Sequence, residues 1–191
     1  MAKGKGVRVG LNDVHYAIMK DDETYEIPKK LAGAIQAKIS PKSNKETLYA
    51  DDQAYEVATS LGDIELELNV ADIPSEVLRD LLGHTINADG VLIKSSEDNA
   101  PYVALGFRSK KSNGKYRYTW IYKGKFQPED QEFATKEDKP KFQTPTISGT
   151  FLPREDNKRW QAQVDEDDTG VKQEVIDNWF KAVYEETPPT P

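Results

Sequence analysis

The sequence predicts a mainly β fold with one or two short helices beside its strands. Apolar and polar residues alternate along 62–71, and an Asn-Gly pair separates two apolar-rich stretches within 101–126. The length of 191 residues is enough for one domain with a buried core. We therefore expect a single domain over residues 1–186, followed by a flexible tail at 187–191.

Two short strands and a long irregular segment are expected first. The strands cover 11–20 and 31–40, with a polar turn and Pro28 between them. Residues 40–60 show no sustained periodicity and form a long connection for a compact domain. Segments of this kind are functional or are ordered by a partner, so we interpret 40–60 as an extended contact loop.

The segment 62–71 is the clearest strand, and its two faces differ. One face is apolar, while the other carries Asp63, Glu65 and Glu67. Apolar residues at helical spacing follow Pro74 and predict a short helix, which Gly83 can end in the left-handed conformation.

The remaining elements are a hairpin, two strands and a helix. The hairpin joins 101–110 to 115–126 through Asn113-Gly114, a pair that supplies the positive φ angles of a tight turn. Thr-rich and proline-flanked strands are expected over 142–151 and 159–164. A C-terminal helix with an acidic start then presents an apolar stripe, formed by Val171, Val175, Trp179 and Val183.

No motif indicates catalysis. The chain has no cysteine, which excludes disulfides, thiolate ligands and cysteine nucleophiles. His15 and His84 lie 69 positions apart and neither has a second nitrogen ligand near it in sequence, and the acidic stretch 165–170 does not fit the calcium-loop template. Phosphate-binding and nucleophile-elbow motifs are absent as well. We therefore expect neither enzyme activity nor a metal or other cofactor.

The chain contains no secretory signal and no apolar stretch of membrane-spanning length. We expect a protein made in the cytoplasm without membrane insertion.

Charge is distributed unevenly along the chain. Residues 106–125 hold seven basic residues and no acid, whereas 161–191 hold eight acids and two lysines. Two interpretations stay open. The basic hairpin of one copy meets the acidic end of another, as in a head-to-tail ring, or the two regions pair within one chain or are simply solvated.

The basic hairpin also suggests an alternative function. Tyr116, Tyr118, Trp120 and Tyr122 lie on one face of the 106–125 hairpin among lysines and arginines, as in proteins that stack single-stranded nucleic acid. Large aromatics on one strand face are also typical of a buried core, and the whole chain is acidic. Nucleic-acid binding through this hairpin is the second hypothesis.

Several short blocks in this chain resemble the major tail protein family of siphophages and related prophages, the subunits of the tail tube. No block is diagnostic alone, but their order and spacing are specific. The blocks are KGVRVGL (5–11), ETLYADD (46–52), GDIELEL (62–68), PYVALGF (101–107), SNGKYRY (112–118) and EDKP followed by FQTP (137–145).

The resemblance implies an antiparallel β-sandwich or barrel-like tail tube fold with a flanking helix. It also implies a structural protein of the virion tail, made in the bacterial host. Six copies would form a ring, and stacked rings would form the conduit for DNA ejection. The implied partners are further copies, the tape measure protein, the tail terminator, and distal tail or baseplate proteins.

The resemblance also implies roles for particular residues. Loops and termini bridge subunits in such tubes, and the channel wall tends to be acidic, so that DNA passes without binding. We therefore expect Asp63, Glu65 and Glu67 to face the lumen; the alternative is a solvated face outside the tube. Inter-subunit contacts are expected at Glu46, Thr47, Leu48, Tyr49, Asp51, Asp52, Lys110, Lys111, Asn113 and Lys115.

Overall fold

The computed structural model describes residues 6–50, 52–128, 135 and 143–186. The strands are β1 (Arg8–Ile18), β2 (Lys29–Leu31), β3 (Ala34–Ala50), β4 (Gln53–Val70), β5 (Thr85–Ile86), β6 (Leu92–Ile93), β7 (Val103–Lys111), β8 (Tyr116–Phe126), β9 (Thr146–Leu152) and β10 (Gln161–Asp165), and the helices are α1 (Ser75–Leu82) and α2 (Gln173–Asn178). All pairings between these strands are antiparallel, which confirms the mainly β prediction. The tail expected at 187–191 lies outside the described residues.

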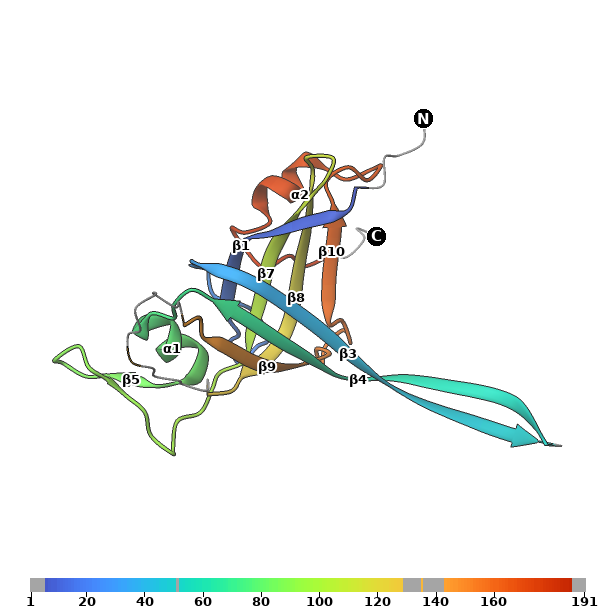
Figure 1. Cartoon of the computed structure of the whole chain (residues 1–191), viewed down its shortest axis with the longest axis horizontal. Coiled ribbons are helices and arrows are strands. Elements are labelled where there is room, and N and C mark those ends of the chain that lie inside the picture. Colours follow the sequence, from blue (N-terminus) through green and yellow to red (C-terminus); the bar gives the residue numbers. More distant parts are fainter. Residues whose placement is uncertain (1–5, 51, 129–134, 136–142, 187–191) are drawn as a thin grey trace.

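Strand β8 joins two layers of one continuous sheet. The strand order is β2-β1-β7-β8-β9-β4-β3, and β10 also pairs with β8. The first half of β8 pairs with β10 and the second half pairs with β9. Because β8 changes neighbour, the β9-β4-β3 part crosses over the β1-β7-β8-β10 part as a second layer (Figure 1). The result is consistent with the expected sandwich-like arrangement.

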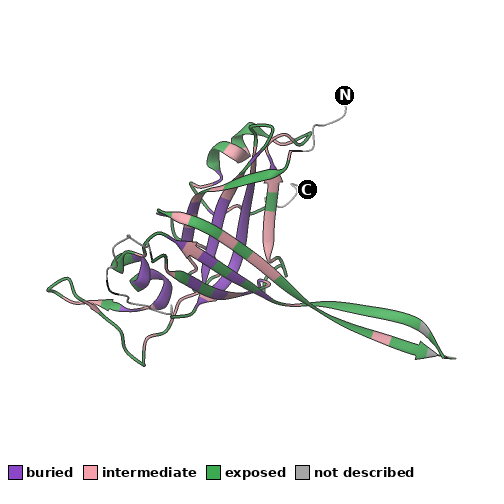
Figure 2. Ribbon diagram, in the orientation of Figure 1, coloured by how far each residue is buried: buried purple, intermediate pink, exposed green. Residues whose placement is uncertain are grey.

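The main core lies between these two layers. Leu66 and Leu68 of β4 are fully buried, as are Leu105 of β7 and Ile121 of β8. Figure 2 shows buried residues along the central strands, while the described side chains of β3 are exposed or half-buried. Each such side chain contributes about 1.5–3 kcal/mol when it leaves water, so this cluster supplies much of the driving force for folding.

A second core covers the opposite face of β7 and β8. Trp120 is completely buried there, and its Nε1 donates a hydrogen bond to the carbonyl oxygen of Trp179 at 2.9 Å. Tyr118 and Tyr122 are buried beside it under α2 and the residues that follow. These three aromatics therefore have no free faces for bases, and the fourth, Tyr116, is half-buried with Arg108 4.3 Å from its ring centroid. The four side chains do not form the stacking platform that the nucleic-acid hypothesis requires.

The helix at Gly83 and the hairpin agree with the sequence prediction. Helix α1 ends at Gly83, whose φ is 76°, and its four apolar residues are buried. A Cβ at Gly83 would lie 2.4 Å from the carbonyl oxygen of Asn99, so only glycine fits. In the 101–126 hairpin the turn has the expected place, but the pair of positive φ angles expected at Asn113-Gly114 is wrong: Gly114 takes a positive φ and Asn113 does not. The amide of Gly114 donates to the carbonyl of Lys111 at 3.0 Å.

The C-terminal helix is shorter than predicted. It ends at Asn178, and Trp179 and Val183 reach the core from the turns that follow. After Asn178 the backbone hydrogen bonds tighten to the i to i−3 pattern, from Trp179 N to Ile176 O at 3.2 Å and from Lys181 N to Asn178 O at 3.0 Å. The turns that result carry Trp179 and Val183 into the second core.

The expected loop at 40–60 is instead the far part of a long hairpin. Strands β3 and β4 stay paired from Ala34–Val70 out to Ala50–Gln53. The single strand predicted over 31–40 is divided between β2 and β3 in the structure, because Gly33, with φ 77°, turns the chain between them. Residues 43–61, called the arm below, project from the rest of the molecule (Figure 1).

Candidate functional site

The arm is a two-stranded ribbon that stands away from both cores. At roughly 3.4 Å per residue, its strands extend for about 25 Å. The two core clusters include none of the described side chains of the arm. An isolated two-stranded ribbon is marginally stable in water, so a ribbon of this length is expected to gain stability from a surface outside the chain.

Large apolar side chains remain exposed along the arm. Tyr49 is 69% exposed, Tyr55 is 75% exposed and Val57 is 48% exposed. Leu48 and Leu61 are exposed as well. Because folded monomers rarely leave such side chains gathered on one element, the arm has the character of a protein contact surface.

The arm carries most of the residues expected to contact other subunits. Glu46, Leu48, Tyr49 and Asp52 are exposed, and Thr47 is half-buried. Asp51 lies outside the described residues. The β4 half of the same surface is formed by Tyr55, Val57, Thr59 and Leu61; the first three fall within the contact segment expected at 40–60 but were not singled out, and Leu61 lies outside it.

A β-bulge explains why these residues were missed. Between the pairs Pro41–Ile64 and Ser43–Leu61, β3 advances two residues while β4 advances three. The extra residue lies at Gly62–Asp63 and shifts the alternation of β4 by one position. Odd-numbered Leu61 and Val57 thereby share a sheet face with even-numbered Ile64, and the apolar face continues from the body into the arm.

The acidic face of β4 is exposed and carries lysines as well. Asp63, Glu65 and Glu67 alternate with fully buried leucine and isoleucine, so they point away from the core. From the neighbouring β3, the Nζ of Lys38 lies 3.2 Å from a carboxylate oxygen of Glu67, and Lys42 pairs with Glu65. The hydrogen bond to Glu65 raises the pKa of Lys42. The face is therefore one of mixed, paired charge.

The basic hairpin and the acidic loop at 165–167 pair within the chain. Lys111 Nζ lies 3.1 Å from Asp165 Oδ2 and 2.5 Å from Asp167 Oδ1. Arg117 donates two hydrogen bonds to Asp165, which hold the pKa of that carboxyl down at about 2. Pairing β10 with β8 brings the two regions together.

Three of the residues expected to contact another subunit are therefore engaged inside the chain. Lys111 and Asn113 bind Asp167, and Lys115 binds Glu166 at 3.0 Å. Lys110 is exposed on β7. Of the two interpretations of the charge asymmetry, pairing within one chain describes the hairpin and its acidic loop.

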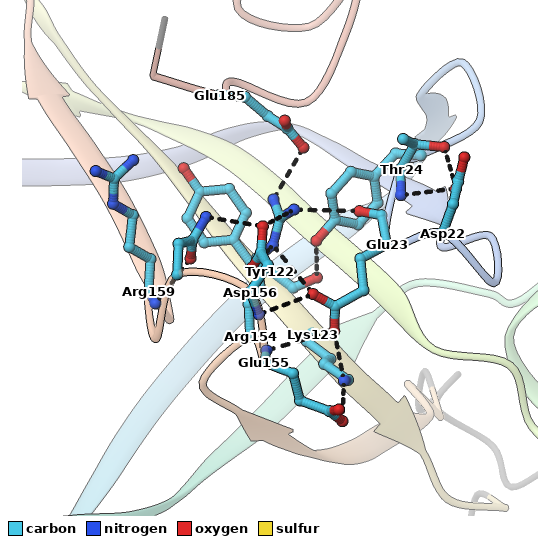
Figure 3. Close-up of polar contacts among 12 residues, drawn as sticks. Asp22, Glu23, Thr24, Tyr122, Lys123, Arg154, Glu155, Asp156, Arg159 and Glu185 are labelled. Carbon is cyan, nitrogen blue, oxygen red and sulfur yellow. Dashed lines mark hydrogen bonds and ion pairs between the residues drawn. The ribbon is translucent and has the colours of Figure 1, made fainter. Parts of the chain in front are cut away.

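A second ion network fastens the C-terminal segment (Figure 3). Buried Lys123 contacts Glu23 at 2.7 Å and Glu155 at 2.8 Å. Hydrogen bonding from Lys123 lowers the pKa of Glu23 to about 2. Buried Arg154 binds Asp156 and Glu185, each at 2.8 Å, and so ties the chain end to the β9–β10 connection. No sequence motif indicated this network.

Both histidines have structural partners. His15 stacks on Phe180 with ring centroids 4.4 Å apart, and His84 Nδ1 lies 2.6 Å from Asp98. Among the described residues, no three histidine, cysteine or carboxylate side chains gather so as to hold a metal ion. In the same part of the chain, no helix has the length and apolar character that crossing a membrane requires.

Comparison with known proteins gives one family. A family model described as phage tail tube protein matches residues 8–187, a range that includes the arm, both cores and the two ion networks. No curated protein matches the sequence at a significant level.

Proposed function

The chain belongs to the phage tail tube protein family, a family of structural virion tail proteins, and we propose that it assembles into stacked hexameric rings. The stacked rings form the tube through which DNA leaves the virion and enters the host. Rings of this kind use head-to-tail interfaces, in which one surface of a subunit meets a different surface of the next.

The projecting arm is the observation that carries this proposal. Its exposed apolar side chains have no partner surface in the described part of the chain, whereas the charged groups of the 111–117 hairpin are paired internally. An element that is apolar, extended and unsupported by its own body is suited to reach a neighbouring subunit. Assembly then buries what folding leaves exposed.

The exposed face of β4 is proposed to line the channel. Asp63, Glu65 and Glu67 repel phosphate, and Glu65 and Glu67 also engage Lys42 and Lys38, the nearest cations. A lysine held by a carboxylate is less available to phosphate, so DNA passes with little binding. The tape measure protein would occupy this channel before ejection, and terminator and distal tail or baseplate proteins would close its ends.

An arm-less variant tests the proposal. Replacing residues 44–60 with Asn-Gly closes a short hairpin between Ser43 and Leu61 and leaves both core clusters intact. The full chain is expected to form rings or hollow tubes in negative-stain micrographs as its concentration is raised, with subunits and assemblies quantified by sedimentation. The arm-less chain should unfold at the same urea concentration and remain a subunit.

Two outcomes would contradict the proposal. The full chain could remain a monomer at every concentration, both alone and with tail initiation proteins present. Alternatively, the arm-less chain could form the same tubes at a similar threshold. A tenfold rise in the threshold concentration corresponds to about 1.4 kcal/mol of lost contact free energy, and losing the arm should exceed this.

A further inference from the structure

We infer that the shaft of the arm, residues 43–47 and 57–61, docks on a second copy of the chain through one face only, while its other face stays in solvent. This inference rests on the proposed tube and specifies which side of the arm forms the contact. It follows from the register of the ribbon, the composition of its two faces and the area that one face offers.

One face of the shaft is suited to burial. The facing pairs Ser43–Leu61, Lys45–Thr59 and Thr47–Val57 point to the same side of the ribbon, because directly opposed residues share a face. Leucine, valine and two threonines give this side flat β-branched and apolar contact area, and the Lys45 stem can lie along it. We call it the odd face, after the residue numbers.

The opposite side is suited to water. It carries the pairs Asn44–Ser60, Glu46–Ala58 and Leu48–Glu56. Within the shaft, Glu46 is the charged residue on this side, and burying its carboxylate against a protein surface is strongly unfavourable unless it finds a cationic partner; Glu56 faces Leu48 at the tip. We call this the even face. Its apolar member, Leu48, belongs to the tip, where Tyr49 and Tyr55 are also exposed, so the tip rather than the shaft is expected to be surrounded.

The bulge at Gly62–Asp63 places the odd face on the same side of the sheet as the buried apolar residues of the body. In the body, the same side of β3 and β4 presents Ile39, Ile64 and Leu66, of which the last two are fully buried against the first layer of the sheet. Without the extra residue, Leu61 and Val57 would pass to the side of Glu65 and Glu67. The chain therefore keeps one continuous apolar side, and on β4 the last residue of this side that is buried by the chain itself is Ile64.

The area of the odd face favours a second copy within a larger assembly. Each strand of the shaft is five residues long, so one side of this two-stranded ribbon offers roughly 170 Å². A stable pairwise interface needs about 800 Å² from each partner, so one docked shaft cannot hold a dimer. A subunit that gives one arm and receives another gains the contact twice, which suits a repeating head-to-tail array of identical chains.

Single cysteines test which face is covered, because the chain has no cysteine of its own. Val57→Cys places a thiol on the odd face, and Ala58→Cys places one on the even face next to it. Both positions are exposed in the subunit, so both thiols should react with a maleimide at similar rates. In assembled tubes, labelling at 57 should slow by at least about tenfold, because it then requires local release of the arm. Labelling at 58 should stay close to its subunit rate.

A second pair of variants repeats the measurement with nearly isosteric changes. Ser43→Cys lies on the odd face and Ser60→Cys on the even face, and both positions are exposed in the subunit. The same contrast is expected. Tubes in which both faces are protected, or only the even face, would overturn one-sided docking while leaving the tube itself in place. Failure of the chain to assemble would instead overturn the proposed function, and this inference with it.

Discussion

Removing the Asp165 carboxylate should destabilise the subunit by about 2 kcal/mol at neutral pH. Hydrogen bonding from Arg117, and then from Lys111, outweighs the opposing effect of burial and lowers the pKa of Asp165 from 3.8 to about 2. That difference corresponds to about 2 kcal/mol between the charged and neutral forms. The estimate applies with little reduction for solvent screening, because the side chain is only 11% exposed. Asp165→Asn keeps the shape and removes the charge.

The stability that Asp165 contributes should decrease as the pH falls. A carboxyl whose pKa is lowered by folding stabilises the native state above its unfolded pKa and loses that contribution as pH falls through the folded value. The wild-type and Asp165→Asn chains should therefore differ by a constant amount from about pH 7 to pH 5. The difference should shrink below about pH 4 and nearly vanish below about pH 2.

Urea unfolding followed by tryptophan fluorescence, at protein concentrations below the assembly threshold, measures the difference. Glu67→Gln is the matched control, because Glu67 pairs with Lys38 at 3.2 Å where both side chains are more than half exposed. Exposed pairs of this kind contribute about 0–1 kcal/mol. A cost at Asp165 no greater than the cost at Glu67, or one that persists unchanged at pH 2, would refute the reasoning.

Four further predictions concern packing, the chain end, the channel and assembly. Gly106→Ala should cost about 1–3 kcal/mol in urea unfolding, because a Cβ there would lie 2.6 Å from the Trp120 ring; a neutral effect would show that the ring is free to move. Trp179→Ala should cost about 3–5 kcal/mol and expose the C-terminal segment to protease, and unchanged digestion would contradict its role in the second core. Reversing the proposed channel charges to lysine should slow DNA ejection and give tubes salt-sensitive DNA binding, whereas normal ejection from intact tubes would exclude a luminal position; the residues are Asp63, Glu65 and Glu67. The threshold for assembly should change little when ionic strength rises from about 0.1 M to about 1 M, and a steep rise would indicate charged contacts between subunits.

Local signals predicted the elements whose geometry is decided locally. The alternation at 62–71, the glycine that ends α1 and the Asn-Gly turn each depend on a few neighbouring residues, and each has the expected place in the structure. The C-terminal helix is different, because Trp179 and Val183 pack into the second core with Trp120 and its neighbours on the distant strand β8. No window of sequence around Trp179 contains those packing partners.

The segment 40–60 was expected as a contact loop, but the pairing of its residues into two strands was not predicted, for a related reason. The apolar residues of β4 change from even to odd numbers at Gly62, so no single period spans 53–70. A one-residue bulge reconciles the two phases in space, but in sequence it looks like the end of a strand. Allowing a phase change at a glycine between two alternating stretches would have extended the strand and identified Val57 and Leu61.

The charge asymmetry shows why net charge along a chain is weak evidence for an interface. The basic hairpin and the acidic loop lie about 50 residues apart in sequence, yet the β8–β10 pairing brings them into contact and satisfies Lys111, Lys115 and Arg117. Lys123 and Arg154 are satisfied in the same way by the second network. Once these ion pairs have formed within the chain, breaking one to form an ion pair with another subunit replaces one contact by a similar one. The net gain in binding free energy is therefore small. The exposed apolar face of the arm gives up no internal contact when it docks, so association through that face has the larger net driving force.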